Sequence, residues 1–307
     1  MAFRSISTNS TGAANLSVTK PSGVVSGDYL IAFKVIDNVG DTFTVTGFSH
    51  ITGSPVSTTI DNQQLAVLVR KADGTEGASF SLDSSNNGIG GVIAFSGIDP
   101  TTQLDVTPSV NSSNASNASP WTITATGVTT STNNCDLVII AGDDITATGD
   151  VTHSTPSGFT NQADLNEGFK NVVVFTGTAG AAGATGNKTF TGTGGAGSGW
   201  AVFLLALRVV ASSPVITAQP ANATVYQGQT ANFTITATSS GGTLHYQWKD
   251  DGSNVGTDSD SYTTAATVLS DNGAQITCDV SDDNGTTSSN AATLQVIATG
   301  VTAWIRA

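Results

Sequence analysis

The sequence predicts an all-β protein in which a duplicated antiparallel β-sandwich or jelly-roll-like module is followed by a second β-sandwich. Many short segments are rich in Thr, Val, Gly and Asn, and only 11% of the residues are charged. β-branched side chains suit a pleated, half-buried surface, whereas Gly and Asn suit turns. Runs of Leu, Glu, Lys, Arg and Met at helical spacing are scarce, so we expect little helix.

The domain organisation follows from length and from one break in the pattern. A chain of 307 residues is long enough for two or three domains. The alternating segments stop at "ASSP" (Ala211–Pro214), and a different pattern begins there. We therefore predict a duplicated module at 1–211, with halves at about 1–105 and 106–211, a second sandwich at 212–297 and a tail at 298–307.

The duplication is indicated by four pairs of segments in the same order, each pair separated by about 110 residues. The pairs are "GDYLIAF" from Gly27 with "CDLVIIA" from Cys135, "GFSH" from Gly47 with "GFTN" from Gly158, "ASFSL" around Phe80 with "KTFTG" around Phe190, and "GVIAFSGI" from Gly91 with "WAVFLLAL" from Trp200. Continuous apolar runs such as "LVIIA" and "AVFLLAL" predict central strands that are covered on both faces.

The second sandwich is predicted from the segments after Pro214. "QTANFTITATS" alternates as a strand, "LHYQWKDDG" is a strand with Trp248 at its centre, and "AQITCDVSDDNG" is a strand with Cys278. Asp271 and Gly273 precede that last strand. This pattern resembles an immunoglobulin-like domain of the intermediate-set kind found in bacterial and phage proteins, whose central tryptophan packs in the core.

Two residues depart from the immunoglobulin-like pattern. Ile235 stands where that family has the cysteine of its second strand, and Ile276 stands where it has a tyrosine. The predicted core is therefore Phe233, Ile235, Trp248, Leu269, Ile276, Cys278 and Leu294, without a disulfide. Cys135 lies in the other module, so we expect both cysteines to be free and the chain to fold in a reducing cytoplasm.

The first 211 residues also resemble a known group. "NLSVTKPSGVVSGDYLIAF" from Asn15, "AFSGIDPTTQLDV" from Ala94 and "AGAAGATGNKTFTG" from Ala179 are similar to a β-rich family met in phage structural genes and some bacterial surface proteins. The N-terminus lacks the apolar core of a secretory signal. Together with the immunoglobulin-like resemblance, this implies a tailed-phage virion protein that is made and folded in the host cytoplasm.

Charge and hydropathy exclude two classes of partner. The net charge is −13, and residues 1–211 and 212–297 each contribute −7. Binding to nucleic acid requires clustered Lys and Arg, so we expect no nucleic-acid partner. No apolar run reaches the ~18 residues of a membrane-spanning helix, so we expect no membrane segment either.

We find no pattern that indicates an enzyme, a cofactor or a metal site. His50, His153 and His245 lack a nucleophile and an acid at motif spacing, and we interpret them as structural. The acidic pairs Asp143/Asp144, Asp250/Asp251 and Asp282/Asp283 fit no Ca²⁺ loop signature, so they are predicted to be solvated turns.

Two functions remain open. The first is a virion structural or accessory protein of the capsid-decoration, head-fibre or tail-fibre type. Its first module would dock on the particle, and its immunoglobulin-like domain would project outward for weak adhesion to the host surface. The second is a carbohydrate-binding module or bacterial surface adhesin, for which Trp121, Tyr226, Tyr246 and Tyr262 are the candidate stacking residues, although we interpret them as half-buried sandwich residues.

The tail "TGVTAWIRA" carries the predicted assembly contact. Trp304, Ile305 and Arg306 follow a sandwich that is already complete at about Ile297. Trp and Arg are frequent anchors of protein interfaces. We therefore expect a homo-oligomer and contacts with other virion proteins; the alternative is that the tail folds back on its own domain or frays as a chain terminus.

Overall fold

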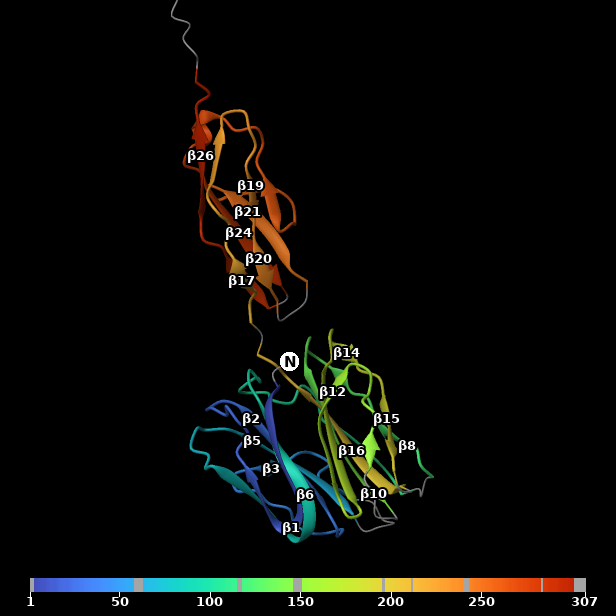
Figure 1. Cartoon of the computed structure of the whole chain (residues 1–307). Helices are drawn as coiled ribbons and strands as arrows, with labels where there is room; N and C mark the ends of the chain where they lie inside the picture. The colour runs from blue at the N-terminus through green and yellow to red at the C-terminus, as the bar shows by residue number, and fades with distance from the viewer. Residues whose placement is uncertain are drawn as a thin grey trace, which may run out of the picture. The chain divides into compact units, whose positions relative to one another are not determined.

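The structure is a computed structural model, and it describes residues 3–57, 63–114, 118–145, 151–194, 197–210, 212–239, 243–282 and 284–300. The chain forms two compact units, Met1–Val210 and Ala211–Ala307 (Figure 1). Within the described ranges, all regular structure is strand apart from one short 3-10 turn, η1 (Leu269–Asp271). The all-β prediction is confirmed.

The first half of unit 1 forms a six-stranded antiparallel sheet. Its strand order is β1-β6-β2-β5-β3, and β4 also pairs with β5. The strands are β1 (Phe3–Thr19), β2 (Tyr29–Ile36), β3 (Ser49–His50), β4 (Val56–Ser57), β5 (Gln64–Lys71) and β6 (Ser79–Phe95).

The second half of unit 1 forms a five-stranded antiparallel sheet with the order β12-β13-β10-β16-β7. Its strands are β7 (Ser109–Ser113), β10 (Asp136–Ile145), β12 (Phe159–Glu167), β13 (Lys170–Thr178) and β16 (Gly197–Leu207). Two smaller sheets accompany it, one with the order β11-β15-β8 and one that pairs β14 with β9. Their strands are β8 (Trp121–Ala125), β9 (Thr129–Thr130), β11 (Thr152–His153), β14 (Gly183–Ala184) and β15 (Lys188–Thr193).

The two halves share one strand order. The orders match strand for strand when β1 is equated with β7, β6 with β16, β2 with β10, β5 with β13, and β3 with β12. The equated pair β2 and β10 carries the duplicated segments "YLIAF" and "DLVIIA". This agreement supports the duplication proposed from the sequence.

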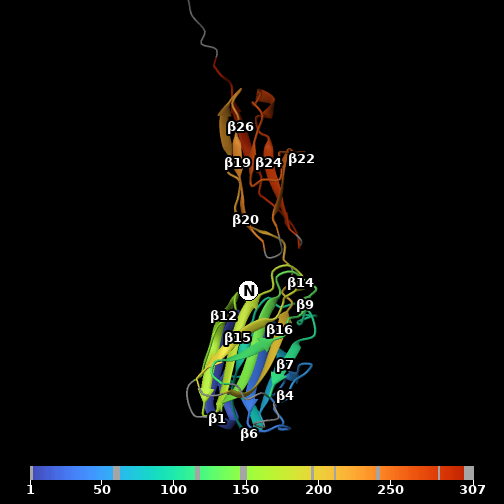
Figure 2. The same ribbon diagram turned by 90° about the vertical axis from the view of Figure 1, so that its right-hand side faces the viewer.

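The main core of unit 1 lies between the two large sheets, which stand face to face in Figure 1 and overlap in the turned view of Figure 2. Ile31 and Phe33 of β2 share this core with Val138 and Ile140 of β10, and all four are fully buried. Alternate side chains of a strand point to opposite faces. The neighbouring residues of β2 therefore point away from this core, yet they are buried as well.

A second layer covers the outer face of each sheet, which explains why the central strands are apolar on both faces. In the first half, β1 and β6 are 17 residues long, and their far ends place Leu16, Val18, Phe80 and Leu82 over the outer face of their own sheet. In the second half, the separate strands β8 and β15 cover the sheet in the same way. Strands covered on both faces read as continuous apolar runs.

Gly90 permits the close pairing of β6 with its neighbour β2 in the sheet. A Cβ atom at Gly90 would collide with the carbonyl oxygen of Phe33 and would lie 2.9 Å from the Cα of Lys34. Glycine in a strand commonly marks such a close backbone approach. The "NNGIGGVIAF" segment is therefore glycine-rich for a packing reason.

Unit 2 is an immunoglobulin-like sandwich. One sheet has the order β18-β26-β24-β21-β22 with β25 beside β24, and the facing strands pair as β17–β20 and β19–β23. β18 runs parallel to β26, and the other pairs are antiparallel. The strands are β17 (Val215–Ala218), β18 (Ala223–Tyr226), β19 (Asn232–Thr234), β20 (Thr236–Thr238), β21 (His245–Asp250), β22 (Ser253–Val255), β23 (Ser261–Thr263), β24 (Gln275–Asp282), β25 (Gly285–Ser288) and β26 (Ala292–Ile297).

Trp248 is the centre of the unit 2 core. It is fully buried, lies opposite Cys278 in the β21–β24 pair, and stacks on Tyr262 with ring centroids 6.0 Å apart. Its indole Nε1 donates a hydrogen bond to the carbonyl oxygen of Ser259 at 2.9 Å. The other buried members of the predicted core set are Phe233, Ile235, Ile276, Cys278 and Leu294.

The core role predicted for Leu269 is wrong, because its side chain is 48% exposed. Thr267 takes the inward position instead and is 2% exposed. The Thr267 hydroxyl donates to the carbonyl oxygen of Gln229 at 2.9 Å, which fixes this residue inward. Leu269 then lies on the short turn η1, which contains no buried residue.

Both cysteines are free and buried, one in each unit. Burial raises the pKa of the Cys278 thiol to about 11, and it also raises the pKa of the Cys135 thiol. Neither thiol is therefore ionised near neutral pH. Ile235, at the position of the missing cysteine, is 4% exposed and fills that space with an apolar side chain.

Candidate binding site

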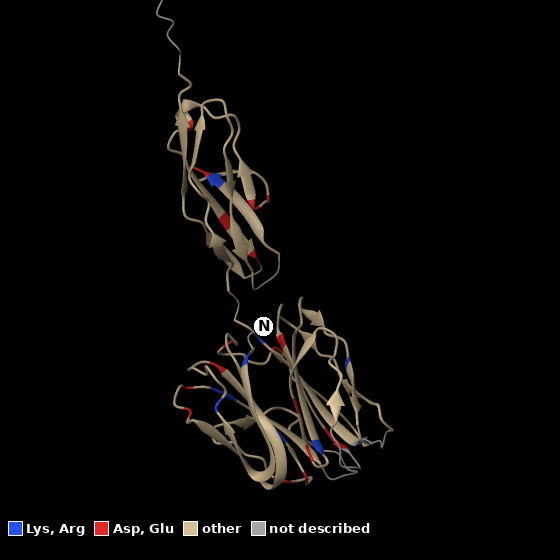
Figure 3. Ribbon diagram, viewed as in Figure 1, with Lys and Arg blue, Asp and Glu red and all other residues tan. Residues whose placement is uncertain are grey.

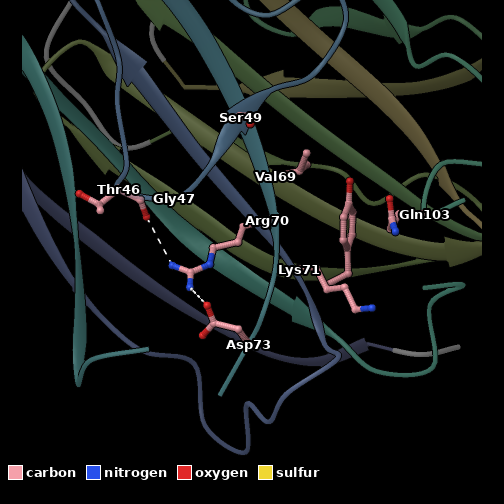
Figure 4. Close-up of a pocket in the computed structure, with 9 residues that line it drawn as sticks. Thr46, Gly47, Ser49, Val69, Arg70, Lys71, Asp73 and Gln103 are labelled. Atoms are coloured by element: carbon pink, nitrogen blue, oxygen red, sulfur yellow. Dashed lines mark hydrogen bonds and ion pairs between the residues drawn. The ribbon is translucent and has the colours of Figure 1, made fainter. Parts of the chain in front are cut away.

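A pocket of about 670 Å³ opens at the end of the first sheet of unit 1 (Figure 4). Its wall includes Tyr29 from β2, Val69 and Lys71 from β5, Ser49 from β3, and Gln103 from the segment that joins the two halves. Pockets with a few convergent polar groups are the usual place for small ligands. This pocket is therefore our candidate binding site.

Strand register places four of these residues on one face of the sheet. Tyr29 lies opposite Lys71 in the β2–β5 pair, and Ser49 lies opposite Val69 in the β3–β5 pair. Directly opposite residues share a face and have Cβ atoms about 5 Å apart, and residues two apart on one strand share a face as well. Tyr29, Ser49, Val69 and Lys71 therefore belong to the same face, the one that Tyr29 shares with the main core.

Gln103 is held in place by the end of β16. The amide of Arg208 donates to the carbonyl oxygen of Gln103 at 2.8 Å, and the neighbouring Leu104 forms a bridge with Leu207. The Gln103 side-chain Nε2 donates to the carbonyl oxygen of Pro100 at 2.8 Å. This bond fixes the amide group and leaves its Oε1 atom as an acceptor for a ligand.

Arg70 lies on the other side of the pocket and is already paired. Its Nη2 lies 2.9 Å from Asp73 Oδ2 and 3.3 Å from Glu76 Oε1, and its Nη1 points toward the carbonyl oxygen of Thr46 (Figure 4). Gly47 has a φ of 80°, which favours glycine, and a Cβ atom there would lie 2.8 Å from this Nη1 and displace the guanidinium. Arg70 therefore shapes the wall, and its charge is offset by two carboxylates.

Four polar groups of the pocket have no partner in the chain. Among the described residues, no hydrogen bond or ion pair is made by the hydroxyl groups of Tyr29, Thr46 and Ser49 or by the ammonium group of Lys71. Burial raises the pKa of the Tyr29 phenol, so it remains protonated and can donate. The pocket thus offers one unpaired cation, three hydroxyl groups and one amide oxygen, and its one carboxylate, that of Asp73, is paired with Arg70.

No sequence motif marks this pocket. Arg70 and Lys71 are the only adjacent pair of basic residues in a chain with ten Lys and Arg. That pair in an acidic chain was the available signal. Ser49 and Gln103 give no such signal, because only the fold brings them to the same place.

A second polar group of residues is buried and closed. His153 Nδ1 lies 2.8 Å from Asp164 Oδ1, its Nε2 lies 3.3 Å from Asp143 Oδ2, and Trp121 Nε1 donates to the same Asp143 oxygen at 3.0 Å. Burial alone would lower the pKa of His153, but the hydrogen bonds and charges of Asp143 and Asp164 raise it to about 9. His153 is therefore a charged structural link between β10, β11 and β12.

The other two histidines also bond to nearby polar groups, and the His50 Nδ1 atom lies 3.2 Å from the Ser54 hydroxyl. His50 lies 3.1 Å from the carbonyl oxygen of Phe43, and the exposed His245 lies 2.7 Å from Asp258. Within the described ranges, no group of three or more His, Cys, Asp and Glu side chains could hold a metal ion, and no helix is long and apolar enough to cross a membrane.

The acidic pairs differ from one another. Asp143 and Asp144 are 1% and 7% exposed within β10, so the prediction of a solvated turn is wrong for this pair. Asp143 is buried because its partners, the side chains of His153 and Trp121, are themselves buried and bond to its Oδ2 atom. Asp251 lies in an exposed turn with a φ of 45°. Asp283 lies outside the described residues.

The four aromatic candidates for sugar stacking are dispersed. Trp121 is 2% exposed and part of the core of the second half, and Tyr262 stacks on Trp248. Tyr246 is partly buried against the unit 2 core. Tyr226 is 53% exposed and is the one candidate among these four with an open ring.

Tyr226 belongs to an apolar surface at one end of unit 2, which we call the end patch: Tyr226, Val268, Leu269 and Ile297. Their exposed fractions range from 41% to 53%. Tyr226 pairs with Ile297 in the β18–β26 register, and the hydroxyl of Thr267, the residue before Val268, lies 3.3 Å from the Tyr226 carbonyl oxygen. The predicted contact residues Trp304, Ile305 and Arg306 lie outside the described residues.

No protein-family model matches the chain, and no curated protein sequence matches it. Among solved structures, it is similar to the four N-terminal immunoglobulin domains of Dscam1 isoform 1.9, with a TM-score of 0.31 and 12% identity over 89% of this chain and 70% of that one.

Two further solved structures show shorter matches. The Ig1-2 module of the Drosophila receptor protein tyrosine phosphatase DLAR has a TM-score of 0.25 and 14% identity over 48% of this chain and 84% of that one. The twitchin kinase region from C. elegans has a TM-score of 0.26 and 19% identity over 30% of this chain and only 18% of that one. The immunoglobulin-like class of unit 2 rests on its own strand pairing and core rather than on these matches.

Proposed function

We propose that this protein is a non-enzymatic structural or accessory component of a tailed-phage virion, of the capsid-decoration, head-fibre or tail-fibre type. Unit 1 docks on the particle, and unit 2 is displayed outward, where it contributes weak adhesion to the host surface. The protein acts as a homo-oligomer or on the virion lattice, and it is made and folded in the host cytoplasm.

The end patch is the observation that carries this proposal. Four large apolar side chains, Tyr226, Val268, Leu269 and Ile297, are each more than two-fifths exposed on one end of a small domain. Contiguous apolar surface of this kind usually marks a protein interaction site. The only helical turn of the described residues, η1, holds Leu269 outward, so the exposure of this side chain is built into the fold.

The occupant that we propose for the end patch is a second copy of the chain. Ile297 is followed by a segment with Trp304, Ile305 and Arg306, so each copy carries both an apolar patch and an apolar segment with a cation. Unit 2 is otherwise acidic, with one Lys and eight Asp between residues 212 and 297 (Figure 3). Arg306 of one copy can therefore be attracted to the acidic unit of another.

Free cysteines and net charge support the proposed setting. Each unit has a complete apolar core without a disulfide, so its folding does not depend on an oxidising compartment. The net charge of −13 favours solubility at the high local density of a particle surface.

Mass spectrometry of purified phage particles tests the virion assignment. We expect the protein at a fixed ratio to the major capsid protein that survives repeated purification. Absence from the particles, with the protein abundant in the infected lysate, would contradict the proposal.

Sedimentation of the purified chain tests the end patch. We expect Leu269→Ser to weaken self-association, whereas Val25→Ser should not, because Val25 is equally exposed, at 54%, but lies in unit 1. Equal association of the two variants would exclude the end patch as the contact.

A carbohydrate-binding module or surface adhesin is the second candidate function. The observation in its favour is the pocket beside Tyr29 and Lys71, whose open polar groups have no structural partner. The two functions are compatible, because a displayed virion protein can also hold a host glycan. Binding of immobilised glycans by the purified full chain would favour this candidate.

A further inference from the structure

We propose that the pocket of unit 1 binds a carboxylated sugar, a uronic or sialic acid residue, with Lys71 as the partner of the carboxylate. This proposal deepens the adhesion part of the function proposed above and rests on it for its biological setting. The binding itself is a property of the pocket and can be measured without particles.

The ligand is anionic because Lys71 has no counter-charge. Arg4, Arg70, Lys170, Arg208 and Lys249 each lie within 4 Å of a carboxylate oxygen. Lys71 has no ion pair or hydrogen bond among the described residues, and its side chain is exposed at the pocket. In a chain with more than twice as many acidic as basic residues, an unpaired lysine in a pocket is unusual.

The ligand carries a single negative charge. Arg70, on the far wall, is already paired with Asp73 and Glu76, so it adds no net positive charge. A phosphate group would bring a charge of about −1.5 to −2 against one ammonium group. The surrounding chain has a net charge of −13, which disfavours a second negative charge. A carboxylate therefore fits the pocket better than a phosphate.

The ligand also carries hydroxyl groups. Tyr29 lies opposite Lys71 by register and lines the same pocket, so its phenol can donate a second hydrogen bond to the ligand. Gln103 offers its fixed Oε1 as an acceptor, and Ser49 offers a hydroxyl that both donates and accepts. Donors and acceptors in this mixture match the hydroxyl groups of a sugar ring.

Val69 gives the pocket its apolar contact. It lies on the same face as Lys71, two residues earlier in β5, and it packs partly against the main core. A sugar ring has C–H groups that can pack on such a side chain while its hydroxyl groups bond to the rim. The site is built on paired strands, so its geometry is set before the ligand arrives.

Ligand-detected NMR with the purified full chain tests the proposal, using methyl glucuronide and methyl glucoside as probes. These two sugars differ in the carboxylate, so their affinities isolate its contribution. We expect the glucuronide to bind at least tenfold more tightly than the glucoside, because hydrogen bonds to a charged group are the stronger kind.

Two pocket variants and one matched control complete the experiment. Lys71→Gln should remove the preference for the glucuronide. Tyr29→Phe should weaken the binding of the glucuronide, and it leaves the buried ring in place. Lys188→Gln is the control, because Lys188 also lacks a carboxylate partner and bonds to the Thr185 carbonyl oxygen at 2.6 Å, outside the pocket. The control should bind like the native chain.

Two outcomes would overturn the proposal. Equal affinity for both sugars, or no saturable binding of either, would exclude a carboxylated sugar at this site. An undiminished preference in Lys71→Gln would place the binding elsewhere on the chain. Both results are independent of whether the protein is found in particles, so the virion assignment and the pocket can fail separately.

Discussion

Raising the pH should destabilise unit 1 through His153. The ring lies between Asp143 and Asp164 at 3.3 and 2.8 Å, and its side chain is fully buried. Two carboxylates on two ring nitrogens require both nitrogens to carry protons, which is the imidazolium form. Loss of that proton leaves buried carboxylate oxygen atoms facing a neutral ring.

The size of the effect follows from the pKa. Burial alone would lower the pKa of His153, but hydrogen bonds and charges of the two carboxylates raise it to about 9 from 6.5. The folded state therefore retains a proton that the unfolded chain releases between these values, so stability is complete below pH 6.5 and falls as the pH rises toward 9. The slope is about 1.4 kcal/mol per pH unit, so the total loss is about 3 kcal/mol.

The assay compares the free energy of unfolding of the native chain and of His153→Gln between pH 6 and 10. Other groups of unit 1 titrate in this range. Lys34 donates to Leu82 and Ser84 at 3.0 and 2.7 Å, and burial lowers its pKa to about 8 although Asp41 and Asp83 oppose this. Its contribution has the opposite sign, because the folded state then loses its proton first.

Lys34 is present in both proteins, so the difference between their curves isolates His153. We expect the variant to be less stable by about 3 kcal/mol at pH 6 and the two curves to converge near pH 10. Parallel curves for the native chain and His153→Gln would refute the charged link.

Three further predictions concern unit 2, the cysteines and the tail. Trp248→Ala should lower the stability of unit 2 by about 3–5 kcal/mol, since the fully buried indole loses its packing and its bond to Ser259; a wild-type denaturant midpoint would contradict this. Reductant should leave both thermal transitions unchanged, because Cys135 and Cys278 are free; calorimetry with and without reductant checks this. Deleting Ala303–Ala307 should weaken self-association without lowering the midpoint of unfolding, and sedimentation of the truncated chain provides the measurement.

The sequence by itself determined the fold class and the centre of unit 2. Period-2 alternation, Gly and Asn turns and continuous apolar runs are local signals, so they can be recognised without knowing the partner strand. Trp248 and Cys278 were placed in one core because a sandwich of known pattern puts them there, and the structure buries both completely. Leu269 was misplaced because the chain takes its inward position at Thr267 and then enters the short turn η1, in which no side chain is buried.

The buried charges were decided by the tertiary structure. From the sequence, Asp143 is predicted to be a turn residue beside Asp144, since Asp is common in turns and the sequence does not show the partners of Asp143. His153 and Trp121 come from other strands, at separations of 10 and 22 residues, and they supply the hydrogen bonds that make its burial possible. A buried charge is stable only when it is paired, and pairing over such separations is a property of the fold.

The candidate pocket was likewise decided by the tertiary structure. Tyr29 and Lys71 become neighbours only through the β2–β5 register, and Gln103 reaches them only because its segment pairs with the end of β16. The sequence supplied an unusual basic pair, Arg70 and Lys71, but it did not show that one is neutralised by Asp73 and Glu76 while the other is open. The sequence shows which side chains are charged. Which of these charges remain unpaired depends on the distances between them, and those distances are set only when the chain folds.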